Sequence, residues 1–293
     1  MKPPPSRPAQ RLAVSIVGDD RRPEWSLFLS TFDPADVLFH VPTLSDAERL
    51  VIAGLFPDVL LLLEDHPRQF SEQDWLSFMA HSPLTRAVAI YTDWCESEPR
   101  TGSPLPGVIR ISWLRWWNFG RALLHALRQG SGSPWNLPPT ASEEERLLVS
   151  LKYTPLVKTD SALKHIAIAA PTQDSFTWLR QAVLPFTSCV SWVHRAIGRN
   201  QPGTPPDLLI IDIGTDGCTI EDSLNVLRAN LWPDLSPAVP CILLMNFPRW
   251  QQVWPLLARG TTRVISKPVF LPELEWVLAE LAQTRDVTCR SPR

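Results

Sequence analysis

The sequence RVISKPVFLPEL (residues 263–274) encodes an apolar strand, a Lys267-Pro268 step at the end of that strand, and the beginning of an amphipathic helix. Earlier in the chain, PDLLIIDI (residues 206–213) reads as a buried strand with one carboxylate, Asp212, near its C-terminal end. The carboxyl ends of parallel strands lie at the same edge of a sheet. We therefore expect neighbouring strands to bring Asp212 and Lys267 together at that edge.

The first half of the chain contains a matching strand. FPDVLLLLE (residues 56–64) resembles PPDLLIIDI (residues 205–213) in its Pro-Asp start and in the apolar run that follows. Continuous apolar runs of this kind are typical of strands that are covered on both faces, as in parallel sheets. The chain therefore reads as a repeat of one unit.

Strands and helices alternate around both runs. In the first half we expect strands at 12–17, 37–41, 59–63, 87–91 and 108–112, with helices at 25–32, from 45, at 71–80 and at 117–127. In the second half we expect strands at 166–169, 189–193, 208–211, 242–245 and 264–266, with helices near 174–183, 221–230, 249–257 and 272–282. Ser45 and Glu48 form a capping box at the helix that begins at 45. The alternation predicts an α/β fold with a five-stranded parallel sheet in each half.

The same pattern divides the chain into five segments. These are a disordered N-terminal segment (1–10), a first domain (11–129), a linker with a short helix (130–162), a second domain (163–284) and a C-terminal tail (285–293). The linker opens with GSGSP, and Ser142 with Glu145 forms the capping box of its helix. A length of 293 residues agrees with two domains.

Composition excludes several classes of protein. A net charge of −2 without a long run of Lys or Arg argues against a nucleic-acid partner. No apolar run approaches the roughly 18 residues of a membrane span, and the start MKPPPSRP lacks the apolar core of a signal peptide. The five cysteines show no CxxC spacing, which favours free thiols in a reducing compartment. We therefore expect a cytoplasmic protein with no membrane segment.

Asp212 and the Lys267-Pro268 step end the third and fifth predicted strands of the second half, and this pattern resembles the receiver domains of two-component response regulators. The resemblance implies two doubly wound, flavodoxin-like domains of strand order 2-1-3-4-5. It also implies that Asp212 stands at the phosphoacceptor position, that Lys267 contacts the phosphate, and that the bond before Pro268 is cis.

Other residues of receiver chemistry are missing from the second half. Receivers hold magnesium with two acidic residues after the first strand, where this chain has Ala170 and Pro171. Met245 replaces the Ser or Thr that ends the fourth strand, and the polar Asn246 comes one residue late. Phosphoryl transfer to a carboxylate needs a divalent cation to offset the charges that it brings together. The resemblance therefore implies a degenerate site without a metal, in which Asp212 and Lys267 form an ion pair.

The first half retains a different remnant of the receiver pattern. Six of its residues stand at or beside the family's site positions: Asp19, Asp20, Leu63, Glu64, Thr92 and Trp113. Thr92 takes the hydroxyl position, but Leu63 replaces the phosphoacceptor and Trp113 replaces the lysine. Gly18 displaces the two aspartates from the usual register. A slip of one residue would present Glu64 in place of Leu63, although the tryptophan would still replace the cation.

The resemblance, with these gaps, implies a tandem of pseudo-receiver domains that signals or scaffolds by protein–protein contact, with no catalytic residue and no cofactor. The implied partner is a protein, such as a histidine kinase or another receiver, and a homodimer is a further expectation. Two alternatives stay open. One is an enzyme or a binder of an anion or small molecule in the crevice near Lys267, and the other is a weakly phosphorylated response regulator at Asp212.

The last helix suggests where a partner binds. At helical spacing, one apolar face gathers five residues: Leu271, Leu274, Val277, Leu278 and Leu281. At about 100° per residue, Trp276 points nearly opposite to this face. We expect Trp276 to lie in a homodimer or partner interface or against the other half of the chain, unless it lies flat along its own helix.

Overall fold

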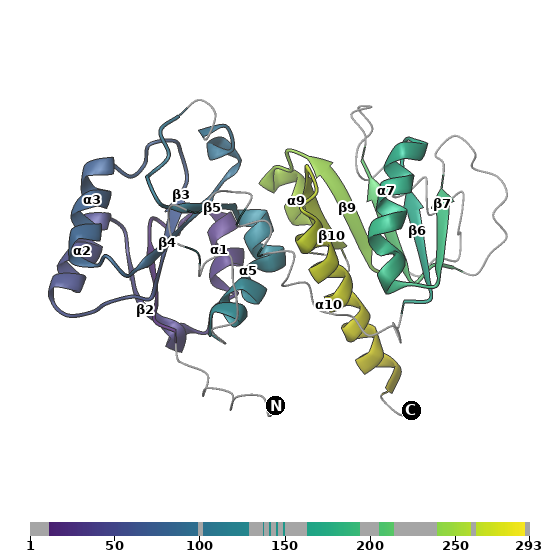
Figure 1. The fold of residues 1–293 in the computed structure, drawn as a ribbon, viewed down its shortest axis with the longest axis horizontal. Coiled ribbons are helices and arrows are strands. Elements are labelled where there is room, and N and C mark those ends of the chain that lie inside the picture. Colours follow the sequence, from purple (N-terminus) through teal and green to yellow (C-terminus); the bar gives the residue numbers. More distant parts are fainter. Residues whose placement is uncertain are drawn as a thin grey trace. The chain divides into compact units, whose positions relative to one another are not determined.

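The structure is a computed structural model. It describes residues 12–98, 102–128, 163–193, 205–213, 239–258 and 262–290, together with residues 137, 141, 145 and 149. The chain divides into two compact units, Met1–Tyr153 and Thr154–Arg293, and each contains its own sheet (Figure 1). The predicted N-terminal segment, most of the linker and the predicted helix at 221–230 lie outside the described residues.

The first unit is built on a parallel sheet of five strands. The strands are β1 (Val14–Val17), β2 (Val37–Val41), β3 (Val59–Glu64), β4 (Arg86–Tyr91) and β5 (Ile109–Ser112). Their order across the sheet is β2-β1-β3-β4-β5. All six residues of β3 are buried, as expected for a central strand that is covered on both faces.

The second unit repeats this arrangement. Its strands are β6 (His165–Ala169), β7 (Cys189–Val193), β8 (Leu208–Asp212), β9 (Cys241–Asn246) and β10 (Thr262–Lys267). The order is β7-β6-β8-β9-β10, which is again 2-1-3-4-5, and every described pairing is parallel. The prediction of two five-stranded parallel sheets in an α/β chain is confirmed.

Helices cover both faces of the first sheet (Figure 1). They are α1 (Pro23–Leu29), α2 (Leu44–Ile52), α3 (Glu72–His81) and α5 (Trp113–Arg128). Helices α2 and α3 pack on the face that carries Leu60 and Leu62 of β3. On the other face α1 meets α5 through aromatic contacts, with the rings of Phe28 and Trp116 5.4 Å apart.

Two helix starts differ from the prediction. Helix α2 begins at Leu44, and its N-cap is Thr43, whose Oγ1 accepts a hydrogen bond from the Asp46 amide at 3.1 Å. The capping box predicted at Ser45 is therefore wrong, because extended backbone at Thr43 already supplies the cap. Helix α5 begins directly after β5 rather than at residue 117, since Ser112 Oγ accepts from the Arg115 amide at 3.2 Å.

The described helices of the second unit are α7 (Gln173–Val183), α9 (Trp250–Leu257) and α10 (Leu271–Arg290). Helices α7 and α10 contribute to one core with the sheet. On α10 the predicted apolar face is buried at Leu274, Val277 and Leu278, and Leu281 packs against the same core, whereas Leu271, the first residue of the helix, is 36% exposed. Helix α10 also continues into the predicted tail, as far as Arg290.

Among the helices of the described ranges, none combines the length and the apolar composition needed to cross a bilayer.

Candidate functional site

Asp212 and Lys267 meet at the carboxyl edge of the second sheet. Lys267 Nζ donates to Asp212 Oδ1 at 2.7 Å and to the carbonyl oxygen of Ile213 at 2.9 Å. The side chain of Asp212 is only 8% exposed and that of Lys267 21%. The Lys267-Pro268 peptide bond is cis, as the family resemblance implied. The two residues do not come from neighbouring strands, however, because β9 lies between β8 and β10 and Lys267 reaches across it.

The described strand ends beside this pair carry few other polar side chains. Strand β6 leads into Ala170, which is buried, and then into Pro171, so that no carboxylate stands at the two positions after the strand. Met245 is buried near the end of β9, whereas Asn246 is exposed and lies opposite Lys267 in the ladder. Among the described strand ends, Asp212 is thus the acidic residue that contacts Lys267, and the two are already paired.

The strand ladders allow the two units to be compared position by position. Val17 ends β1 and pairs with Leu62, and Ala169 ends β6 and pairs with Ile211. The residues that follow these partners, Leu63 and Asp212, therefore occupy equivalent positions. The same two residues are aligned when the sequences FPDVLLLLE (56–64) and PPDLLIIDI (205–213) are compared.

The fourth strands show a difference from the prediction. Lys267 pairs with Asn246, and Ser112 pairs with Tyr91. In the first unit, Thr92 follows Tyr91 and Trp113 follows Ser112. Thr92 is therefore equivalent to Asn246, and Trp113 is equivalent to Lys267. Thr92 and Met245, both assigned to the hydroxyl position from sequence, are therefore one residue out of register with each other.

Hydrocarbon fills the acceptor position of the first unit. Leu63 is fully buried, and a Cβ atom added to Gly18 would lie only 2.7 Å from its Cβ. Gly18 has a φ of +137°, a conformation that side-chain-bearing residues rarely adopt. Trp113 is also buried, and its Nε1 donates to Asp93 Oδ1 at 3.1 Å. Thr92 Oγ1 donates to the carbonyl oxygen of Asp65 at 3.0 Å, which leaves the hydroxyl in a structural role.

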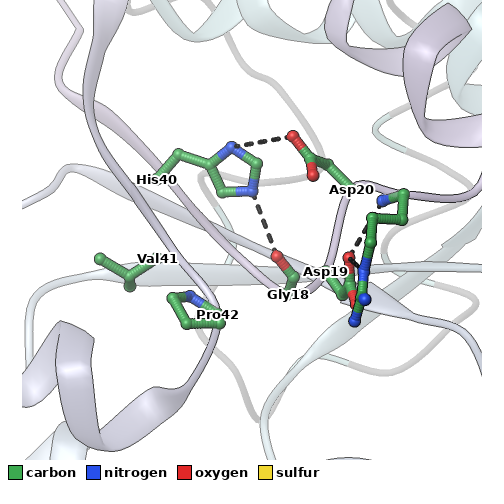
Figure 2. A pocket seen from close by; sticks show the side chains of 7 residues that line it. Gly18, Asp19, Asp20, His40, Val41 and Pro42 are labelled. Atoms are coloured by element: carbon green, nitrogen blue, oxygen red, sulfur yellow. Dashed lines mark hydrogen bonds and ion pairs between the residues drawn. The ribbon is translucent and has the colours of Figure 1, made fainter.

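Asp19 and Asp20 line a pocket of about 390 Å³ beside the ends of β1 and β2 (Figure 2). Arg21 Nε donates to Asp19 Oδ2 at 2.7 Å, and this bond lowers the pKa of Asp19 to about 2. His40 lies between Asp20 and Gly18, with Nδ1 3.9 Å from Asp20 Oδ2 and Nε2 3.2 Å from the Gly18 carbonyl oxygen (Figure 2). Each of the two carboxylates thus has a nitrogen neighbour of its own.

A buried charge cluster, formed by Glu64, Glu98, Arg110 and Cys95, is the feature of the first unit that the sequence analysis missed. Arg110 of β5 lies with Nη1 2.6 Å from Glu64 Oε2 and with Nη2 3.5 Å from Glu98 Oε2. The same guanidinium donates to the Cys95 carbonyl oxygen at 3.3 Å. It also lies over the ring of Tyr91, 5.0 Å from the ring centroid.

Burial dominates the electrostatics of this cluster. It raises the pKa of Glu64 to about 7, although Arg110 acts to lower it; the charge of Glu98 raises it further. Burial also raises the pKa of Cys95 to about 12, with Glu64 and Glu98 adding to the effect. Glu64, Cys95 and Glu98 offer three potential metal ligands within 4.8 Å of one another. The guanidinium already supplies the positive charge there, and a metal ion would have to displace it.

The position of Glu64 also excludes the slip of register considered from the sequence. Leu60 and Leu62 face α2 and α3. Side chains alternate along a strand, so Glu64 lies on that face and Leu63 on the other. Glu64 therefore does not substitute for the missing acceptor, and its cation is Arg110 rather than a residue at the position of Trp113. The signal in the sequence was Arg110 itself, a charged residue between Ile109 and Ile111 of a strand.

Comparisons with known proteins give no close relative. No family model matches this chain, and no curated protein is significantly similar to it. Among solved structures, a putative two-component system response regulator/GGDEF domain protein is 12% identical, with 94% of this chain and 99% of that chain covered at a TM-score of 0.35. A probable protein of the same description is 11% identical, with 94% and 99% covered and a TM-score of 0.33.

A phosphoglycerate oxidoreductase from Vibrio cholerae is 13% identical, with 95% of this chain and 98% of that chain covered at a TM-score of 0.26. Similarities at this level carry no argument about function. The fold class rests on the strand order itself, which in both units is that of the flavodoxin-like α/β fold to which receiver domains belong.

Proposed function

We propose that this protein is a non-catalytic signalling or scaffold protein whose two pseudo-receiver units act through protein–protein contact. The observation that carries the proposal is that both acceptor positions are already occupied by structural interactions. Asp212 is paired with Lys267 at 2.7 Å, and Leu63 is buried against Gly18.

The second unit lacks the charge balance of phosphoryl transfer. Adding a phosphoryl group to Asp212 would bring negative charge to a carboxylate that is only 8% exposed. Receivers offset this charge with a divalent cation, yet Ala170 and Pro171 follow β6 where carboxylates would have to hold it. Lys267 carries a single positive charge, and the ion pair with Asp212 already neutralises it.

Exposed aromatic side chains supply a means of contact. Trp94 follows β4 in the first unit and is 73% exposed, and Phe247 follows the equivalent strand β9 and is 67% exposed. Large apolar side chains on a surface often mark protein contacts, and tryptophan is enriched among the residues that dominate binding energy. Both units thus present an aromatic residue just after the fourth strand, near the degenerate acceptor site.

Affinity capture with matched variants tests this function. The tagged full-length protein is used to capture partners from extracts of its native cells, beside Trp94→Ser, Phe247→Ser and a Leu84→Ser control. Leu84 is 92% exposed but precedes β4, at the opposite edge of the sheet. We expect a partner, such as a histidine kinase or a receiver protein, that the control retains and at least one aromatic variant loses. Identical recovery with all four proteins would contradict a contact at these residues.

The competing functions make different predictions at the second site. An anion binder would bind inorganic phosphate in calorimetry and would lose that binding in Lys267→Met. A phosphorylated regulator would gain mass from a small phosphodonor in the presence of magnesium. Either result would show that the second unit does more than contact a protein partner.

A further inference from the structure

An apolar patch lies at the amino edge of the first sheet, opposite the edge that carries the acceptor position. Its members are large exposed side chains: Ile52 (63% exposed), Leu55 (39%), Phe56 (59%) and Leu84 (92%). The first three lie in one stretch between the end of α2 and the start of β3, and Leu84 lies in the loop before β4. These four residues form the amino-edge patch. Large apolar side chains gathered on a surface often mark a contact.

A hydrogen bond joins the two loops that carry the amino-edge patch. Thr85 Oγ1 donates to the carbonyl oxygen of Pro57 at 2.8 Å. Phe56 directly precedes Pro57, and Leu84 directly precedes Thr85. Strands β3 and β4 are neighbours in the sheet, so that the phenyl ring and the leucine side chain stand on adjacent loops at the ends of adjacent strands. The patch is therefore continuous across these two strands.

The chain enters the first sheet beside this patch. The Ala13 amide donates to Asp58 Oδ2 at 2.8 Å, and the Ala13 carbonyl oxygen accepts from the Asp58 amide, also at 2.8 Å. Asp58 comes two residues after Phe56, on the strand that pairs with β1. Leu12, the residue before Ala13, is buried. Residues 1–11 therefore join the fold next to the strand whose start carries Phe56.

The composition and the length of this N-terminal segment suit the patch. Its sequence, MKPPPSRPAQR, contains prolines at positions 3, 4, 5 and 8. Proline-rich segments favour the polyproline II conformation, which lets them bind aromatic and apolar surfaces at a low cost in conformational entropy. At about 3.1 Å per residue, eleven residues reach about 34 Å. Strand β4 is two strands away from β1, which is about 10 Å, so that the segment is long enough to cross the patch.

We propose that residues 1–11 dock on the amino-edge patch of their own unit, with the prolines against Phe56 and Leu84. The inference goes beyond the proposed function, because it concerns a contact within the chain rather than with a partner. The linker is a rival occupant, since the Leu137 carbonyl oxygen accepts from Arg86 Nη1 at 3.1 Å. With Leu137 held there, however, Leu84 is still 92% exposed, so that this part of the linker does not cover it.

Hydroxyl-radical footprinting, read by peptide mass spectrometry, tests the docking by comparing the full chain with a chain that lacks residues 2–10. A segment tethered at Leu12 has an effective concentration in the millimolar range, so that a contact with a Kd of about 1 mM is formed in about half of the molecules. We therefore expect the oxidation of Phe56 and Leu84 to rise about twofold or more in the shortened chain. Oxidation of Trp94, at the opposite edge of the sheet, should stay the same. Equal oxidation of Phe56 and Leu84 in the two chains overturns the proposal.

Two further measurements separate this segment from other occupants. Replacing Pro3, Pro4 and Pro5 by glycine keeps the length of the segment but removes its conformational preference, and should raise the oxidation of Phe56 and Leu84 as the deletion does. If the shortened chain does not fold, wild-type oxidation in this glycine variant overturns the proposal instead. Dilution of the full chain should leave the footprint unchanged. Oxidation of the patch that rises on dilution would assign it to a second copy of the chain and would also overturn the proposal.

Discussion

Arg110 reaches across β4 to Glu64, just as Lys267 reaches across β9 to Asp212. In each unit a cation on the fifth strand thus pairs with a carboxylate on the third strand, and the fourth strand passes between them. The two pairs are not equivalent residues, because Arg110 stands three positions before Trp113, the residue in register with Lys267. The first unit therefore links its third and fifth strands through a different pair of residues.

Asp212 should resist phosphorylation. We expect no mass increase when the protein is incubated with acetyl phosphate and magnesium, since no carboxylate follows β6 at Ala170 and Pro171 to hold the metal. Intact-mass spectrometry is the measurement, with Asp212→Asn as the control. A stoichiometric gain of one phosphoryl group that this variant abolishes would show that the second unit is an active receiver.

Lys267→Met should destabilise the second unit. The Asp212 side chain is 8% exposed, and losing the lysine leaves its charge without a partner. We expect a loss of about 2–3 kcal/mol, between the roughly 3–5 kcal/mol of a fully buried pair and the 1 kcal/mol or less of an exposed one. Denaturant unfolding measures the change. Arg49→Met, which removes an exposed pair with Asp46, serves as the control and should change stability little; equal effects would mean that water solvates the Asp212 pair.

The first unit should lose stability as the pH rises from about 5 to 8. Folding raises the pKa of Glu64 from 4.5 to about 7, so the stabilising contribution is complete below pH 4.5 and is lost as the pH rises through 7. Between pH 5 and pH 8 this shift changes the free energy of unfolding by about 2–3 kcal/mol. Urea unfolding at the two pH values measures it, and Glu64→Gln should lose less stability over this range than the wild type. A variant with the same pH profile as the wild type would assign the effect to other groups.

Trp276→Glu should weaken association and leave the fold intact. Trp276 is half-buried on α10, in a helix whose core face is formed by Leu274, Val277 and Leu278. A charge introduced there would disfavour any apolar contact that the indole makes with another protein. Sedimentation and partner capture are the measurements, with circular dichroism to verify folding. Unchanged results in both assays would exclude Trp276 from the interface.

The fold could be predicted because its determinants are local. Apolar runs such as Leu60–Leu63 and Leu208–Ile211 are typical of strands that are covered on both faces. The alternation of these strands with helices indicates parallel pairing. Helix starts were less accurate, as at Thr43, where the choice between two capping residues depends on the backbone that precedes the helix.

The site could be predicted only in part. Asp212 and Lys267 were found because both stand at strand ends in a pattern that resembles a known family. The cluster around Glu64 was not found, since it joins Arg110 and Glu98 from segments whose register the sequence does not specify. The same lack of register explains why Thr92 and Met245 were assigned to one position.

Gly18 has a consequence for how the first unit can change during evolution. Any residue with a Cβ atom at position 18 would collide with the Cβ of position 63, whether that position carries leucine or an aspartate. An acidic residue at position 18 is therefore incompatible with every side chain at position 63. A mutation from Leu63 to aspartate would place a carboxylate at position 63 while position 18 still could not carry one, so that this backbone excludes a pair of carboxylates at positions 18 and 63.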